Sequence, residues 1–336
     1  MRTLTFAAAI EDALAQAMAD DPRVVIIGED VQALRRSLFA RFGAGRVRST
    51  PISEAAFVGM AVTAAMAGLR PVVEVMMADF LGVAMDALLN HAAKVEAFSG
   101  GKWRAPLVLR VAAGGGYGDA GQHEQCLWGW LAHIPGLSVV VPSEPADAGR
   151  LMLTALAQAG PVVYMEHKLL SQEWLETLGV GGRKNVSFDV PPAGARGPAP
   201  ARWEPLPIGQ AATRRAGDDL TIVSLGVGVH RALRAAEMLQ EQGVSAGVID
   251  LRWVAPLDRQ SVCAAVTRSG RLLVVDEDYR DCGLSGELAA AVLEAGLAPR
   301  FARVCTEETI PYAHSLELRV LPNVQRIVDA ALKLLA

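Results

Sequence analysis

The feature that most constrains this chain is the regular alternation of short apolar, β-branched runs with longer helix-like segments. Runs such as VVIIG (24–28), PVVEVM (71–76) and LVLRV (107–111) predict buried strands. A segment that can form a helix follows each of them, such as residues 79–98 after the second run. Strands that alternate with helices usually pair in parallel, with helices on both faces of the sheet. The pattern therefore predicts doubly wound α/β architecture.

The alternation stops between residues 171 and 207, where proline, glycine and alanine dominate (VPPAGARGPAPARWEPLP) and no periodicity survives. Such a segment is either a linker or a strap that wraps the surface. A chain of 336 residues is long enough for two domains. We therefore expect two doubly wound domains, over residues 1–170 and 208–336, joined by a linker over 171–207.

Composition and the chain start limit the partners and the compartment. The 32 Lys and Arg against 36 Asp and Glu give a net charge of -4, which provides no bulk attraction for nucleic acid or anionic lipid. Glu11 and Asp12 interrupt the apolar start, unlike a signal peptide, and the uncharged run 55–69 is shorter than the ~20 residues that span a bilayer. The four cysteines form no metal-ligand pair and suit a reducing compartment. We expect a cytoplasmic protein with no nucleic-acid or membrane partner.

Two glycine patterns admit more than one interpretation. The run LTIVSLG (220–226) is followed by Gly228, and Asp250 ends the next predicted strand, where a dinucleotide fold places its ribose-binding acid. Arg231 stands where the third glycine of that fingerprint belongs, so a plain strand-to-helix turn is the alternative. The second pattern, GGGYG (114–118), follows a predicted strand and is either an active-site loop or a simple connection.

Three further residues allow both a chemical and a structural explanation. Glu54 opens a long apolar helix, either as a site carboxylate or, with Ser53 as N-cap, as a stabiliser of the helix dipole. Phe80 is either a ring-stacking platform or a core aromatic. His123, at the start of a helix expected over 121–133, is either a site residue or a surface residue.

Five segments taken together favour the chemical explanation. They occur in the order TPISEAAFVGMAVTAAMAGLRPVVEVMMADF (50–80), GGGYGDAGQHEQ (114–125), HIPGLSVVVPSEPADA (133–148), PVVYMEHKLL (161–170) and VIDLRWVAPLD (248–258). This series resembles the beta subunit of the thiamine-diphosphate-dependent first component of 2-oxo acid dehydrogenase complexes, of the pyruvate, branched-chain 2-oxo acid or acetoin type. The resemblance covers nearly the whole chain.

The resemblance implies a fold and a reaction. The first domain would be the pyrimidine-binding fold of thiamine-diphosphate enzymes, and the second a transketolase C-terminal-like domain. The implied reaction is the decarboxylation of a 2-oxo acid, or the cleavage of acetoin. The acyl group would then pass to lipoamide on a lipoyl-bearing acyltransferase.

The resemblance also assigns roles to four residues. Glu54 matches the catalytic glutamate, whose carboxyl group hydrogen-bonds the cofactor's pyrimidine ring and so promotes loss of the thiazolium proton. Phe80 matches the aromatic residue that stacks on the pyrimidine, and Ile52 an apolar cofactor contact. His123 matches a catalytic histidine that transfers protons or guides the lipoyl group.

An absent motif implies a partner. Thiamine enzymes hold the diphosphate through magnesium bound by a G-D-G…N motif, but Gly118-Asp119-Ala120 lacks the second glycine and the downstream asparagine. The chain would therefore hold no metal itself and supply half of a site. The resemblance implies an alpha subunit that brings the magnesium and the diphosphate, in an α2β2 heterotetramer.

Departures from the family pattern keep alternatives open. Glu124 stands where the family often has serine, and Gln158-Ala159-Gly160 replaces the acidic-Asn pattern of its structural potassium site, so that site is not carried over. One alternative is a two-component, thiamine-dependent carboligase or transketolase-like enzyme without lipoyl transfer. Alternatives of another class are a dinucleotide-binding oxidoreductase and a non-catalytic scaffold subunit.

Overall fold

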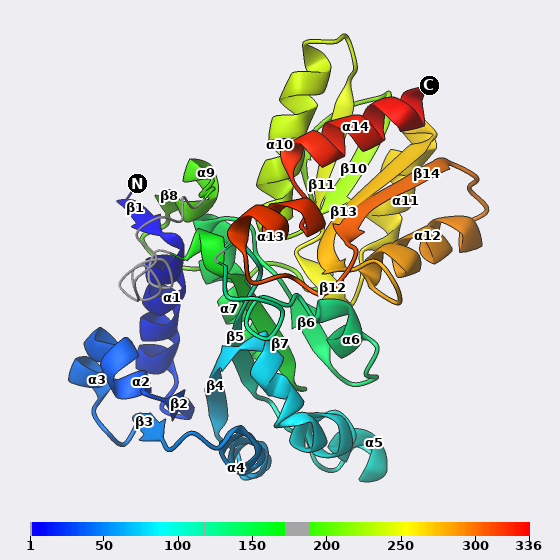
Figure 1. The fold of residues 1–336 in the computed structure, drawn as a ribbon. Helices are drawn as coiled ribbons and strands as arrows, with labels where there is room; N and C mark the ends of the chain where they lie inside the picture. The colour runs from blue at the N-terminus through cyan, green and yellow to red at the C-terminus, as the bar shows by residue number, and fades with distance from the viewer. Residues whose placement is uncertain (1, 117, 172–188) are drawn as a thin grey trace.

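A seven-stranded sheet organises the first half of the chain in the computed structural model, which describes residues 2–116, 118–171 and 189–336 (Figure 1). The strand order is β12-β6-β7-β5-β4-β2-β3. Six strands run parallel: β2 (Val24–Glu29), β3 (Val47–Thr50), β4 (Arg70–Met77), β5 (Val108–Ala113), β6 (Ser138–Val140) and β7 (Val162–His167). The edge strand β12 (Trp253–Ala255) is antiparallel and comes from the second half of the chain.

Helices cover both faces of this sheet, because successive strand side chains point to opposite sides. Val24 and Ile26 belong to the core under α1 (Phe6–Asp20) and α7 (Pro145–Ala157). Val25 and Ile27 belong to the core under α4 and α6. The helices not yet given bounds are α2 (Val31–Leu34), α3 (Arg36–Phe42), α4 (Glu54–Met66), α5 (Val95–Phe98) and α6 (Trp128–Ala132).

The second half is built on a five-stranded sheet with the order β14-β13-β10-β11-β9. Its strands are β9 (Ala212–Arg215), β10 (Leu220–Ser224), β11 (Ala246–Asp250), β13 (Arg271–Tyr279) and β14 (Arg300–Thr306), of which only β9 is antiparallel. Helices α10 (Val227–Gln240) and α14 (Val324–Leu335) pack on one face, and α11 (Arg259–Ser269) and α12 (Leu284–Glu294) on the other. The predicted doubly wound α/β architecture is confirmed in both halves.

Residues 189–207 form a strap along the first half of the molecule. The strap contains α9 (Pro192–Ala195) and β8 (Arg196–Ala199), which pairs antiparallel with β1 (Arg2–Thr5). Trp203 is buried, and its Nε1 donates to Asp12 Oδ2 at 2.6 Å. Gly149 of α7 leaves room for the indole, since a Cβ there would lie 2.5 Å from the ring. The part of the segment over 172–188 lies outside the described residues.

Two helices expected from the sequence are wrong in extent. The segment 79–98 is broken into a 3-10 turn η1 (Ala78–Gly82), a π-helical turn η2 (Ala87–Ala92) and α5, and the glycine at 82 disfavours a continuous helix. The helix expected over 121–133 is confined to α6. A tertiary contact uses a backbone donor at the start of the expected helix, since Gly121 N donates to Ile310 O at 3.0 Å.

Buried charges join the two halves. Arg214 of β9 donates to Asp250 Oδ2 at 2.7 Å and to Glu144 Oε1 at 2.8 Å, and it also pairs with Asp147 of α7. Arg252 donates to the same Asp147 at 2.7 Å. Because these groups are largely buried, removing one partner would leave an uncompensated charge.

A pair of carboxyl groups lies at the same junction, between β13 and α6. Asp276 accepts from Trp128 Nε1 at 2.9 Å, and Asp278 accepts from Gly129 N at 2.8 Å. Burial, followed by the charge of Asp276, raises the pKa of Asp278 to about 8. Burial raises the pKa of Asp276 as well. The pair therefore favours a protonated form around neutral pH.

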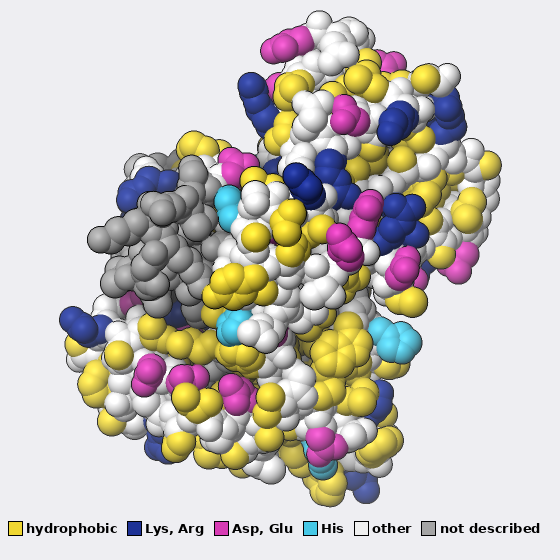
Figure 2. All heavy atoms as spheres, in the orientation of Figure 1, with side chains coloured by type: hydrophobic (Ala, Val, Ile, Leu, Met, Phe, Trp, Pro, Cys, Tyr) yellow, Lys and Arg dark blue, Asp and Glu magenta, His cyan; other side chains and the backbone are white. Residues whose placement is uncertain are grey.

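The described helices include none that has the length and apolar character to cross a membrane. Figure 2 shows acidic and basic side chains interspersed on one face, and hydrophobic side chains around α6 and α5. The exposed side chains there include Trp130 and Phe98.

We predict that Trp203→Ala lowers the free energy of unfolding by about 3–5 kcal/mol, because it empties a closed space between α1 and α7. Chemical denaturation followed by circular dichroism measures the change. The control is Trp103→Ala, at an exposed indole, for which we expect a change below about 0.5 kcal/mol. Equal effects of the two substitutions would show that the strap does not stabilise the fold.

We predict that Asp278→Asn reduces the loss of stability with rising pH. A carboxyl group whose pKa is raised on folding stabilises the folded protein most at low pH, and that contribution is lost as the pH rises through about 8. Thermal melts between pH 5 and pH 9 should therefore decline less steeply in the variant. The exposed neighbour Asp281, changed to Asn, is the matched control. A variant with the wild-type slope would contradict the prediction.

Candidate functional site

Several polar side chains lie at the carboxyl edge of the seven-stranded sheet, the edge at which parallel α/β sheets bind ligands. Glu29 is the last residue of β2, and Asp79 and Phe80 follow β4. The glycine-rich segment follows β5, and Lys168 follows β7. Because these four strands are neighbours in the order β7-β5-β4-β2, their ends form one continuous rim.

A row of alternating buried charges fixes this rim from below. Arg35 Nε donates to Glu74 Oε1 at 2.8 Å, Arg110 Nη1 donates to the same oxygen at 3.2 Å, and Arg110 Nη2 donates to Glu166 at 3.1 Å. Burial alone would raise the pKa of Glu74, but Arg35 and Arg110 lower it to about 2. Glu74, Arg110 and Glu166 lie on β4, β5 and β7, so the row locks three adjacent strands.

Glu54 begins α4 directly after β3 and is buried, with 8% of its surface exposed. The structural alternative requires the Ser53 side chain to cap this helix. The Ser53 hydroxyl instead donates to Pro51 O at 3.1 Å and makes no capping hydrogen bond. Glu29 lies near enough to sense the charge. Burial first, then Asp30 and Glu54, raise the pKa of Glu29. A buried carboxyl group therefore faces the rim beside a second acid.

Phe80 and His123 come together, as the resemblance implied for two residues of one site. Their ring centroids lie 5.6 Å apart, with an interplanar angle of 81°. Within the described part of the chain, the buried Nδ1 of His123 has no hydrogen-bond partner. Such an orphaned polar atom in a native site calls for a ligand or a water molecule.

Ile52 and Glu54 lie farther along the rim. Their connection follows β3, which is separated from β4 by β2 alone. The Ile52 side chain is 73% exposed, so the candidate cofactor contact lies open on the surface of this chain.

The backbone around His123 is held by buried polar contacts. Lys168 Nζ donates to His123 O, and Gln125 donates to Asp79 Oδ1 at 2.7 Å. Burial lowers the pKa of Lys168, while the charges of Glu124 and Asp79 oppose that shift. The unusual Glu124 is itself buried and accepts from Asp119 N at 3.1 Å. This acid therefore stabilises the loop from inside.

A second buried cluster, of Cys126, His167 and Glu277, has the spacing of a metal site, with ligand atoms within 4.8 Å. The donors are already used. His167 Nε2 bonds to Glu277 Oε1 at 3.0 Å, and His167 Nδ1 accepts from Leu169 N at 3.2 Å. Arg231 donates to Glu277 Oε2 at 2.7 Å, and burial raises the pKa of the Cys126 thiol. The cluster fits a structural hub rather than a set of metal ligands.

The segment where the family pattern would place potassium is also occupied. Arg70 Nη1 donates to Leu156 O at 2.6 Å and to Gln158 O at 3.2 Å, at the carboxyl end of α7. A guanidinium cation thus already satisfies these carbonyl groups, and they do not fit a potassium ion.

The dinucleotide alternative loses its main support. Gly226 forms the N-cap of α10, with a φ of 53°, as a tight turn requires. Asp250, the candidate ribose ligand, is fully buried and accepts from Ser143 Oγ at 2.5 Å and from Arg214. Arg231 turns inward to Glu277. The turn serves packing between the halves.

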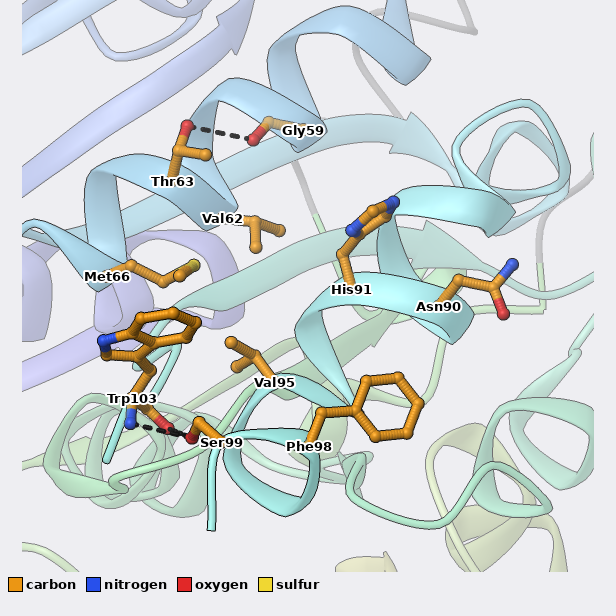
Figure 3. A pocket seen from close by; sticks show the side chains of 10 residues that line it. All are labelled: Gly59, Val62, Thr63, Met66, Asn90, His91, Val95, Phe98, Ser99 and Trp103. Carbon is orange, nitrogen blue, oxygen red and sulfur yellow. Dashed lines mark hydrogen bonds between the residues drawn. The ribbon is translucent and has the colours of Figure 1, made fainter. Parts of the chain in front are cut away.

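An apolar pocket of about 390 Å³ lies between α4 and the η2–α5 region (Figure 3). Val62 and Met66 line it from α4, and Phe98 and Trp103 from the other side. Phe98 and Trp103 are 80% and 60% exposed. The pocket contains none of the predicted site residues, but it opens on the helix that Glu54 begins.

Sequence reasoning missed four charged residues of the rim: Glu29, which is partly exposed, and Lys168, Glu277 and Glu317, which are buried. Glu29 and Lys168 carry a signal, because each ends or follows an apolar strand run. Glu277 and Glu317 come from the second half of the chain, and no local pattern connects them to this edge.

Comparison with known proteins agrees with this architecture. Residues 2–173 match the transketolase pyrimidine binding domain, and residues 209–327 match the transketolase C-terminal domain. A solved structure titled "Split gene transketolase, inactive beta4 tetramer" shares the fold, with a TM-score of 0.78 and 22% identity over 99% of this chain and 98% of that one.

Three curated relatives cover almost all of this chain. It is 37% identical to the pyruvate dehydrogenase E1 component subunit beta of Rhizobium meliloti, over 98% of this chain and 69% of the relative. It is 36% identical to the acetoin:2,6-dichlorophenolindophenol oxidoreductase subunit beta of Cupriavidus necator, over 99% and 97%. It is 35% identical to the 2-oxoisovalerate dehydrogenase subunit beta of Bacillus subtilis, over 100% and 99%. This chain therefore belongs to the transketolase-like family of beta subunits that includes those of pyruvate, acetoin and 2-oxoisovalerate dehydrogenases.

Proposed function

We propose that this chain is the beta subunit of a thiamine-diphosphate-dependent 2-oxo acid dehydrogenase that passes an acyl group to lipoamide. The observation that carries the proposal is the rim itself. A buried carboxyl group, Glu54, lies on the same edge as the Phe80–His123 ring contact. The 2-oxo acid is pyruvate or a branched-chain 2-oxo acid, with acetoin cleavage as the variant reaction.

The residues present fit the pyrimidine end of the cofactor. When bound, thiamine diphosphate supplies the carbanion chemistry by which a 2-oxo acid loses carbon dioxide. Glu54 offers a buried carboxyl group that holds a proton at a pyrimidine ring nitrogen. Phe80 offers a ring to orient the pyrimidine, and Ile52 offers apolar contact.

His123 suits proton transfer near the reacting atoms. Its Nδ1 is buried and lacks a hydrogen-bond partner among the described residues, so it is available to a substrate group. The edge of Phe80 limits the ring's orientation, and Lys168 holds the histidine's carbonyl group. In the acyl-transfer step, the same nitrogen would guide the lipoyl group.

The diphosphate end calls for a partner. The one metal-like cluster among the described residues is the saturated hub around Glu277. An alpha subunit would bring the magnesium ion and the diphosphate contacts, in an α2β2 heterotetramer. Met66, Phe98 and Trp103 line the apolar pocket beside α4 and are exposed, which supports a covering subunit on this face. We place the assembly in the cytoplasm, with a lipoyl-bearing acyltransferase as its acceptor.

We predict that Glu54→Gln, purified with the alpha partner, lowers the decarboxylation rate by about 100-fold or more, because an amide cannot hold the transferable proton. Steady-state assays on a panel of 2-oxo acids measure the loss, and size-exclusion chromatography should show an unchanged assembly. The matched control is Glu241→Gln, at an exposed carboxylate. Substantial retained turnover in the Glu54→Gln variant would contradict the proposed role of Glu54.

We predict that His123→Gln lowers the lipoamide-dependent rate more than the rate with an artificial electron acceptor, because the ring would guide the lipoyl group. The exposed His133, changed to Gln, is the control. Unchanged rates with both acceptors would contradict the role of His123. Activity of the wild-type pair with aldehyde acceptors but not with lipoamide would favour the carboligase alternative.

A further inference from the structure

The glycine-rich segment that follows β5, residues 114–118, has no role in the proposed function. The second half of the chain nevertheless accepts hydrogen bonds from its backbone. Gly115 N donates to Glu277 Oε1 at 2.7 Å. Gly116 N donates to Glu317 Oε1 at 2.6 Å, and Gly118 N approaches the same oxygen at 3.4 Å. Two carboxylates from the second half thus receive backbone donors of a loop that belongs to the first half.

The conformation of the loop favours these hydrogen bonds. Gly116 has a φ of 109°, a value that side chains disfavour, and a Cβ there would lie 2.9 Å from Leu169 Cδ1. Glycine lets neighbouring amides turn toward a shared acceptor. Donors that converge in this way bind anions well, and here the anion is a side chain of the protein.

Glu317 is placed for this purpose. It lies on α13 (His314–Val320) and has 0% of its surface exposed. Its second carboxylate oxygen lies 2.7 Å from His314 Nδ1. A buried carboxylate is retained only where hydrogen bonds compensate its desolvation, and two loop amides donate to Glu317.

A short segment of backbone, held by further hydrogen bonds, connects the glycine-rich loop to His123. Gly121 N donates to Ile310 O at 3.0 Å, on the segment that leads into α13, and His123 N bonds to Ala120 O at 3.1 Å. On the other side of the histidine, Gln125 accepts from Tyr279 OH at 3.0 Å. The backbone of His123 is therefore held between contacts made by the second half.

We propose that Glu317 is a positioning residue: by holding the glycine-rich loop, it fixes His123 against Phe80. The inference deepens the proposed function and rests on it for the role of His123. The second half of the chain then has a direct part in the site, since its carboxylate sets the geometry of a histidine that belongs to the first half.

The test compares Glu317→Leu, Glu317→Gln and the control Glu308→Leu, which removes an exposed carboxylate nearby. Hydrogen exchange read by mass spectrometry on peptides across residues 111–127 reports the loop, and peptides from β4 and β10 report the folded cores. Turnover is measured with the alpha partner, separating kcat from the KM for the 2-oxo acid.

We expect Glu317→Leu to raise exchange in the loop about tenfold or more, with the cores unchanged. We also expect kcat to fall at least about tenfold while KM changes little, because a misplaced catalytic group slows the chemical step. Glu317→Gln, which retains an acceptor oxygen but loses the charge, should give values between those of the wild type and those of Glu317→Leu for both properties. Glu308→Leu should match the wild type.

Three results would overturn the inference: loop exchange unchanged in Glu317→Leu, a loosened loop with unchanged kcat, or no recovery in a folded Glu317→Gln. If Glu317→Leu fails to fold, the Gln variant decides alone: a small rise in exchange confined to the loop, with kcat reduced, supports the inference, and wild-type values overturn it. If the wild-type pair has no 2-oxo acid activity, the proposed function fails. The exchange data then still test whether Glu317 holds the glycine-rich loop in place.

Discussion

The buried row of alternating charges from Arg35 through Glu74 and Arg110 to Glu166 is the constraint on which the site depends. Glu74, Arg110 and Glu166 lie on neighbouring parallel strands, and Arg35 reaches Glu74 from the turn between α2 and α3. Because an unpaired buried charge would be costly, these pairs favour one register of the strands. The row ends just below the carboxyl edge. The residues of the rim therefore begin from strand ends whose spacing is fixed.

The two halves of the chain meet through polar groups as well as through a shared apolar core. Arg214 and Asp147 tie β9 to α7, and Glu277 reaches from β13 to the end of β7. The strand β12, which lies in the second half of the sequence, completes the first sheet. Both halves of the chain therefore stabilise the edge of the sheet at which the candidate site lies.

Much of the fold followed from the sequence, because strand and helix periods reflect burial on each element. The runs at 24–28 and 71–76 formed the strands expected of them. The four site residues could be nominated only from the order of several segments, since Glu54 alone fits a helix start equally well. The helix expected over 121–133 failed because a cross-domain hydrogen bond to Ile310 competes with local structure. Glu277 and Glu317 escaped notice because they lie 162 and 201 residues from the loop amides they bind.

We propose that this chain supplies the pyrimidine edge of a thiamine-diphosphate site and that the alpha partner holds the magnesium ion and the diphosphate. Isothermal titration of thiamine diphosphate with magnesium, into this chain alone and into its assembly with the alpha partner, tests it most directly. We predict saturable binding by the assembly and none by the single chain at the same concentrations. Equal affinity in the two titrations would contradict it.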